Sequence, residues 1–206
     1  AQKIAKQYQV PFLQENFKEN PFLKKFYDDP STYALALENH FMEDRFQQFQ
    51  TFVNDRVSSS GGVADHSLFR SLIFAQINLS SSDFDAFKKH YLECFKTFSF
   101  PQKVIFLKHT INQLKKNIIC RGRPYEQKIS GEYLNKIERG YQSFFNGESD
   151  FDFCDIDLSD LNFVKGEAAY QIILLRIKAF LVYCKNPIKT RHYQQLYLRS
   201  FCFLFV

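Results

Sequence analysis

Short runs typical of β-strands alternate along this chain with longer segments that have a helical hydrophobic pattern. The strand-like runs span residues 9–15, 103–109 and 150–157, and a further short run ends at Asp65. Between and after them come helical patterns, at residues 20–29, 32–52, 66–77, 80–98, 110–119, 130–145 and 166–184. Strands separated by helices pair in parallel, so this order predicts an α/β fold in which helices cover both faces of a parallel sheet.

The size and charge of the chain narrow the class of protein further. Its 206 residues, 45% of them hydrophobic, suit one domain of ordinary size. The formal net charge is +5, but the stretch after Leu181 holds four basic residues and no acid, which accounts for all but one of these charges. The basic balance therefore belongs to the tail, and we expect no nucleic-acid partner from it.

Cysteine and histidine positions do not indicate a metal centre. The five cysteines are scattered without a C-x-x-C spacing, and no two of the five histidines are spaced as H-x-x-x-H. We therefore predict no metal-ligating residues and a reduced, cytoplasmic protein. No run approaches the roughly 18 apolar residues of a membrane span, so we expect no membrane partner. No signal peptide is recognisable, although the chain begins at Ala1 without an initiator methionine.

Functional groups of a parallel sheet gather at the carboxyl ends of its strands. Glu15 ends the first predicted strand, and Asp65 ends the second. A loop at residues 121–127 follows the helix after the third strand, and Arg121 and Arg123 stand in it, one residue apart. Their guanidinium groups can converge on one phosphate. The alternative is a solvated helix terminus whose positive charges complement the helix dipole.

The loop and the helix after it, RGRPYEQKISGEYLNKI, resemble the lid of the deoxyribonucleoside kinases. Members of this P-loop family transfer the γ-phosphate of ATP to the 5′-hydroxyl of a deoxynucleoside. Similar segments occur elsewhere in the family's order: QENFKENPFLKKFYDDP, TYALALENHFMEDRFQQ, VADHSLFRSLIFA and DIDLSDLNFV. The resemblance spans residues 1–180 and is to bacterial members that carry N-P-F-L and R-G-R-P-Y-E-Q.

The resemblance implies roles for four residues at the reacting end of the site. Glu15 matches the general base that accepts the proton of the 5′-hydroxyl, and Asp65 matches an acid near the magnesium ion. Arg121 and Arg123 match lid arginines that bind the phosphates of ATP and stabilise charge on the transferred phosphoryl group. ATP and Mg²⁺ are thus the implied cofactors.

Four further residues are implied to bind the deoxynucleoside. Tyr27 and Glu126 match the pair that holds the 3′-hydroxyl of the sugar. His66 stands where most members have an arginine near the 5′ end, and an imidazole lacks the guanidinium's fork and its permanent charge. Glu38 stands where most members have a glutamine that reads the base. A carboxylate only accepts hydrogen bonds, which suits the N1–H and 2-amino donors of guanine. The alternative for Glu38 is a side chain that points to solvent.

The phosphate-binding loop of this family, G-x-x-x-x-G-K-[ST], does not occur in the 206 residues. The opening AQKIAKQYQV resembles the later part of the helix that follows this loop, so we expect the first strand and the Walker A loop to be missing. A truncated product and a genuine loss in a non-catalytic relative both remain open. Either would leave a hydrophobic gap in the parallel sheet and lower the stability.

The chain divides into a kinase-like domain at residues 1–181 and a tail at 182–206, for which an extra helix, a partner-binding segment and a read-through artefact remain open. We predict a bacterial nucleotide-salvage enzyme that phosphorylates a purine deoxynucleoside, with this chain as an inactive fragment. Family members are commonly dimers, which implies a homodimer. The alternatives are a non-catalytic P-loop relative that acts as an interaction or structural protein, and a nucleic-acid binder that acts through its tail.

Overall fold

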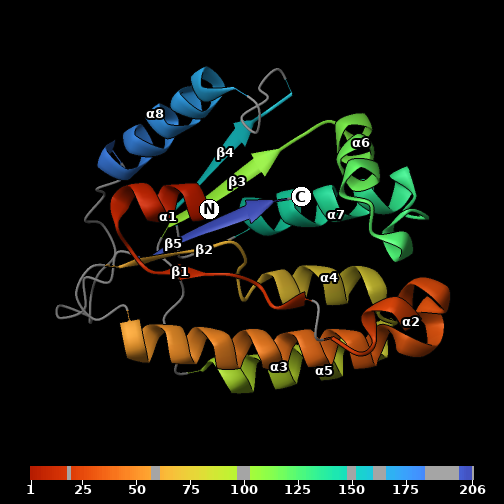
Figure 1. Cartoon of the computed structure of the whole chain (residues 1–206). Helices are drawn as coiled ribbons and strands as arrows, with labels where there is room; N and C mark the ends of the chain where they lie inside the picture. Colours follow the sequence, from red (N-terminus) through yellow and green to blue (C-terminus); the bar gives the residue numbers. More distant parts are fainter. Residues whose placement is uncertain are drawn as a thin grey trace.

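The computed structural model describes residues 1–17, 20–56, 61–96, 103–147, 152–159, 166–183 and 200–205. Its strands are β1 (Phe12–Leu13), β2 (Gly62–Ala64), β3 (Lys103–Lys108), β4 (Asp152–Asp157) and β5 (Ser200–Phe205). They form one sheet in the order β1-β2-β5-β3-β4, in which every neighbouring pair is parallel. Helices lie on both sides of this sheet (Figure 1). The α/β class predicted from the sequence is confirmed.

Helices occupy the connections between the strands. They are α1 (Gln2–Tyr8), α2 (Leu23–Asp28), α3 (Pro30–Arg56), α4 (Arg70–Asn78), α5 (Ser81–Phe95), α6 (Ile111–Arg121), the short 3-10 helix η2 (Pro124–Glu126), α7 (Gly131–Asn146) and α8 (Glu167–Tyr183). Ser80, Thr110 and Ser130 cap α5, α6 and α7, because each side-chain oxygen accepts a backbone N–H of the first turn. The starts that the sequence predicted for these three helices are therefore confirmed.

One strand and one helix are shorter in the structure than the sequence predicted. The strand predicted at 9–15 is only Phe12–Leu13, because it lies at the edge of the sheet and its neighbour β2 has just three residues to pair with. The helix predicted from residue 66 begins at Arg70, because residues 65–69 turn the chain out of β2. This turn places Asp65 at the carboxyl edge of the sheet.

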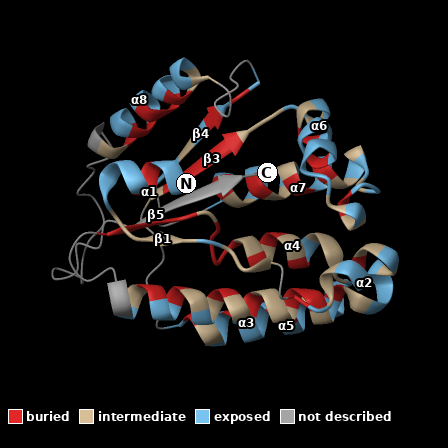
Figure 2. Cartoon of the chain, in the orientation of Figure 1, coloured by how far each residue is buried: buried red, intermediate tan, exposed pale blue. Residues whose placement is uncertain are grey.

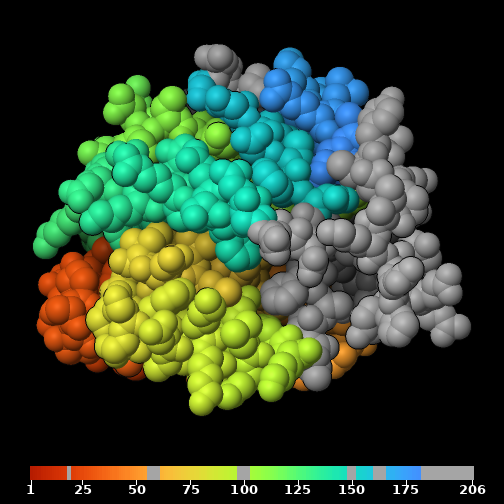
Figure 3. All heavy atoms as spheres, turned by 180° about the vertical axis from the view of Figure 1, so that it is seen from behind, coloured from red at the N-terminus to blue at the C-terminus, as the bar shows by residue number. Residues whose placement is uncertain are grey.

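Strand β3 shows how the sheet is buried on both faces. Ile105 and Leu107 pack with residues of α1 and α8, whereas Val104 and Phe106 pack with residues of α4 and α7. Figure 2 shows the buried residues along β3 and on the inner sides of the helices. Seen from behind, α4 lies between α7 and α5 (Figure 3). No helix within the described ranges combines the length and apolarity that crossing a membrane requires.

The tail supplies the middle strand of the sheet. β5 pairs with β2 on one side and with β3 on the other, and Cys202 is in register with both Ala64 and Val104. The gap that we expected in the sheet is therefore not present, and that prediction is wrong. The residues that connect α8 to β5, 184–199, lie outside the described part of the chain.

Proline at position 202 should test whether the tail strand completes the sheet. Cys202→Pro removes a backbone N–H from a strand that has a hydrogen-bonding neighbour on each side. We expect the free energy of unfolding in urea to fall by roughly 1–3 kcal/mol, the cost of leaving a buried polar group unpaired. Cys202→Val, which keeps the backbone donor, is the matched control. Equal stability of the two variants would contradict the placement of β5.

Candidate active site

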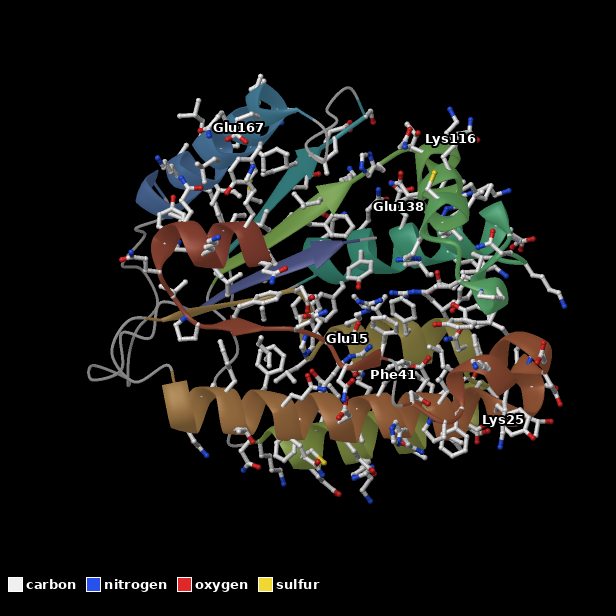
Figure 4. The ribbon with its side chains drawn as sticks, in the orientation of Figure 1. Glu15, Lys25, Phe41, Lys116, Glu138 and Glu167 are labelled. Atoms are coloured by element: carbon white, nitrogen blue, oxygen red, sulfur yellow. The ribbon has the colours of Figure 1, made fainter. Side chains whose placement is uncertain are left out.

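Glu15 lies just beyond β1 and faces helices α3 and α4 (Figure 4). Arg45 of α3 donates to Glu15 Oε1 from Nε at 2.9 Å and from Nη2 at 2.6 Å, and Arg70 of α4 donates from Nη1 to Oε2 at 3.3 Å. The side chains of Glu15, Arg45 and Arg70 are 13%, 4% and 23% exposed. Burial opposes ionisation, but the charges of Arg70 and Arg45 outweigh it and hold the pKa of Glu15 well below its usual range. The carboxylate is therefore ionised at neutral pH.

Asp65 lies next to Glu15 at the end of β2. Its Oδ1 accepts the backbone N–H of Glu15 at 2.8 Å, which joins the ends of β1 and β2. The same oxygen lies 3.1 Å from Nδ1 of His66, whose side chain is completely buried and meets the ring of Phe49 edge-on. The two strand-end acids are thus brought together as predicted, whereas the His66 ring packs into the core beside Asp65.

Arg45 is a site residue that sequence reasoning missed. In addition to Glu15 it binds Ser71, with Nη1 2.7 Å from Oγ, and its guanidinium lies 4.7 Å from the centre of the Phe41 ring. A signal was present in the sequence. Arg45 follows Glu38 by seven residues, which is about two helical turns, so the two side chains share one face of α3.

Glu38 is 1% exposed, so the alternative of a solvent-facing side chain is wrong. Its Oε1 accepts from Asn78 Nδ2 at 2.7 Å, and Asn78 Oδ1 accepts from the Tyr133 hydroxyl at 3.0 Å. Its Oε2 is buried and has no hydrogen-bond partner among the described residues. Burial raises the pKa of Glu38 to about 7, although the hydrogen bond from Asn78 acts in the opposite direction.

The predicted arginine pair lies where α6 ends and the loop to α7 begins. Helix α6 ends at Arg121, and Gly122 follows with φ of 69°, a left-handed conformation that glycine adopts without strain. Glu126 forms ion pairs with both arginines, with Arg121 Nη2 2.8 Å from Oε2 and Arg123 Nη1 2.9 Å from Oε1. The two guanidinium groups therefore converge on one anionic group, which in this structure is the protein's own carboxylate.

Tyr27 of α2 lies against this loop. Its ring centre is 5.7 Å from that of Tyr125, and burial together with the negative charge of Glu126 raises its pKa to about 12. The hydroxyl therefore keeps its proton and is a hydrogen-bond donor at neutral pH. The ring of Phe17, two residues after Glu15, lies 3.8 Å from the guanidinium of Arg123. The segment that carries the buried acid thus also contacts the loop.

Electrostatic coupling joins these groups into one site. The positive charge of Arg70 acts to lower the pKa of both Glu38 and Tyr27. Glu126 acts to raise the pKa of Tyr27 and Arg121 acts to lower it, so the coupling extends to the lid loop. The structure therefore gathers the eight predicted side chains around one region: Glu15, Tyr27, Glu38, Asp65, His66, Arg121, Arg123 and Glu126.

A family model described as deoxynucleoside kinase matches residues 1–182. This chain belongs to the deoxynucleoside kinase family. The match runs to the end of α8 and leaves out the tail that contains β5. The family predicted from the lid sequence is therefore confirmed, and with it the P-loop kinase fold.

Individual relatives of this deoxynucleoside kinase family member agree with the match. Deoxyguanosine kinase of Bacillus subtilis is 26% identical over 188 residues, which are 88% of this chain and 90% of the relative. Deoxyadenosine/deoxycytidine kinase of the same bacterium is 23% identical over 175 residues, which are 81% of this chain and 79% of the relative. The structure of deoxyadenosine kinase from M. mycoides with bound dATP has a TM-score of 0.72 at 21% identity, covering 86% of this chain and 91% of that chain. This last likeness shows the fold.

Glu38→Gln should change how the stability of the protein depends on pH. The pKa of Glu38 is about 7 in the folded protein, against an ordinary value of 4.5. The folded state therefore binds this proton more tightly, so the carboxyl group contributes stability below its ordinary pKa that is lost as the pH rises through 7. The loss corresponds to roughly 3 kcal/mol.

Glutamine does not titrate, so the free energy of unfolding of Glu38→Gln relative to wild type should rise by roughly 3 kcal/mol between about pH 4.5 and pH 8. Urea denaturation at several pH values measures this difference. Glu43→Gln, at an exposed position of the same helix, should show no such trend. A constant difference between Glu38→Gln and wild type would show that Glu38 titrates normally.

Proposed function

We propose that this protein transfers the γ-phosphate of ATP to the 5′-hydroxyl of a purine deoxynucleoside. The observation that carries the proposal is Glu15, an ionised and largely buried carboxylate that two arginines fix at the carboxyl edge of a parallel sheet. Such a group accepts the proton of the hydroxyl as its oxygen attacks phosphorus. A low pKa makes it a weak base, but phosphoryl transfer passes through a loose transition state in which positioning counts for more than basicity.

Tyr27 and Glu126 hold the sugar in this proposal. The Tyr27 hydroxyl keeps its proton and donates, and the Glu126 carboxylate accepts, so together they suit the single 3′-hydroxyl of a deoxyribose. Glu126 also holds Arg121 and Arg123 close to each other. Binding of the sugar at Glu126 and placement of the two arginines are thereby coupled through one carboxylate.

Arg121 and Arg123 bind the phosphates of ATP in this proposal, since guanidinium groups suit phosphate oxygens. A magnesium ion carried by the nucleotide would supply neutralisation of the phosphate charge. In this proposal Asp65, at the carboxyl edge of the sheet and 25% exposed, would hold this ion. Among the described residues there is no group of three acidic, histidine or cysteine side chains that could hold a metal, so nucleotide and water would provide the other ligands.

The second candidate function is that of a non-catalytic relative that retains the nucleoside site. These 206 residues contain the lid arginines but no G-x-x-x-x-G-K-[ST] motif to hold the triphosphate. We therefore expect the 206-residue chain to bind a deoxynucleoside without phosphorylating it. A cytoplasmic location and a homodimer remain predictions.

Kinase assays on the longest form that the gene encodes test the proposed function. We expect ATP-dependent formation of a deoxynucleoside 5′-monophosphate, and we expect Glu15→Gln to lower kcat about 10²–10⁴-fold with a smaller change in KM, because it removes the base and keeps the shape. Glu132→Gln, which alters an exposed glutamate of α7, is the matched control. Binding without turnover in the longest form would support the non-catalytic relative, and an unchanged kcat in Glu15→Gln would remove this residue from the mechanism.

Glu38 reads the base in this proposal. Its Oε1 is already used by Asn78, while Oε2 is a buried acceptor without a described partner. Above pH 7 the ionised form of Glu38 predominates. Guanine offers N1–H and the 2-amino group side by side, so this form can accept from it, whereas adenine would place an acceptor nitrogen against a negative oxygen. Mismatched buried polar groups are costly, which makes Glu38 a strong determinant of specificity.

We therefore expect deoxyguanosine to bind more tightly than deoxyadenosine or deoxycytidine, and Glu38→Gln to shift the preference towards the latter two. Competition calorimetry with the four deoxynucleosides measures this on the 206-residue chain. Glu43→Gln on the exposed side of α3 should leave the ranking unchanged. A preference for deoxyadenosine or deoxycytidine that persists unaltered in Glu38→Gln would show that this carboxylate does not read the base.

A further inference from the structure

Arg70 is the first residue of α4, where the helix dipole disfavours a positive charge. Its guanidinium nevertheless reaches Glu15, with Nη1 3.3 Å from Oε2, and lies 5.0 Å from the centre of the Phe74 ring. The aromatic ring fixes the guanidinium from one side, and the carboxylate fixes it from another. The charge of Arg70 therefore stabilises the carboxylate of Glu15, although it does not stabilise the helix α4 that it begins.

The residue expected to serve the 5′ end from the sequence resemblance is His66. Its side chain is completely buried, lies beside Asp65 and carries no guanidinium. Arg70 stands four residues later, at the other end of the turn that leaves β2. Position 66 thus lacks a guanidinium, but Arg70, four residues later in the chain, brings one to the carboxylate of Glu15.

Arg70 also has a donor that Glu15 does not use. Its Nε is buried and has no hydrogen-bond partner among the described residues. Arg45 differs in this respect, because its Nε and Nη2 donate to Glu15 and its Nη1 donates to Ser71. A buried N–H without an acceptor is unfavourable, so the unpaired donor of Arg70 indicates a missing partner at this end of the site.

We propose that Arg70 is the positioning residue of the 5′ end: it holds Glu15 through Nη1, and its Nε–H binds the 5′-oxygen of the substrate. The identity of that substrate rests on the proposed function. Glu15 faces Arg45 from α3, Arg70 from α4, and Asp65 and His66 from the turn after β2. Among these groups Arg70 does most to lower the pKa of Glu15 against the opposing effect of burial.

Arg70→Met tests the proposal in the longest form that the gene encodes, because methionine fills similar space without charge or donor. We expect kcat to fall about tenfold or more with a smaller change in KM. The acid limb of the pH profile of kcat should move to higher pH, since Glu15 loses the charge that lowers its pKa. Arg176→Met, at an exposed position of α8, is the matched control. A wild-type kcat and acid limb in Arg70→Met would overturn the proposal.

A second measurement does not require turnover. In the 206-residue chain with isotope-labelled glutamate, NMR titration should show a higher pKa for Glu15 in Arg70→Met than in Arg176→Met. Calorimetry should show deoxyguanosine 5′-monophosphate bound about tenfold more weakly, a loss of roughly 1.4 kcal/mol. Arg70→Gln replaces the methionine variant if the latter does not fold. If both shifts occur but the longest form shows no kinase activity, the proposed function is refuted and the role of Arg70 stands. Turnover by the longest form with neither shift in the 206-residue chain would refute the role of Arg70 alone.

Discussion

A buried negative charge is tolerated only where fixed positive charges surround it, and Glu15 imposes this requirement on the whole site. Arg45 meets it from α3 and Arg70 meets it from α4, so both helices are held relative to the end of β1. The backbone N–H of Glu15 also bonds Asp65, which adds the end of β2. Contacts with one residue therefore fix two strands and two helices, and the geometry of the site is set before a substrate binds.

The site contains two carboxylates whose surroundings push their pKa values in opposite directions. Arginine charges lower the pKa of Glu15, whereas burial raises that of Glu38 to about 7. Arg45 and Arg70 act on both groups, so the difference comes from contact: Glu15 is paired with both guanidiniums, and Glu38 is paired only with the neutral amide of Asn78. Two carboxyl groups whose surroundings give them different pKa values are suited to different roles. Here one suits accepting a proton, and the other suits recognising a neutral base.

Local patterns predicted the parts of this molecule that depend on neighbouring residues. The helix starts at Ser80, Thr110 and Ser130 and the strand-end acids Glu15 and Asp65 could be predicted from the sequence, because helix starts and strand ends are short-range features. Arg45 and Arg70 could not be assigned in the same way. Each contacts Glu15 across at least 30 residues of sequence, and the chemistry of an arginine does not say which acid it will meet.

The middle strand was missed for a different reason. Membership of a sheet depends mainly on backbone hydrogen bonds and on an apolar run that tolerates burial on both faces, so a strand needs no family-specific motif. The tail sequence SFCFLF meets that requirement, although it lies beyond the residues 1–182 that the family model matches. Because β5 pairs with both β2 and β3, the tail holds the two halves of the sheet together. One half of the sheet carries Glu15 and Asp65 at its carboxyl edge, and the other half leads to the lid loop. Their relative placement therefore depends on β5, which contributes none of the site residues described above.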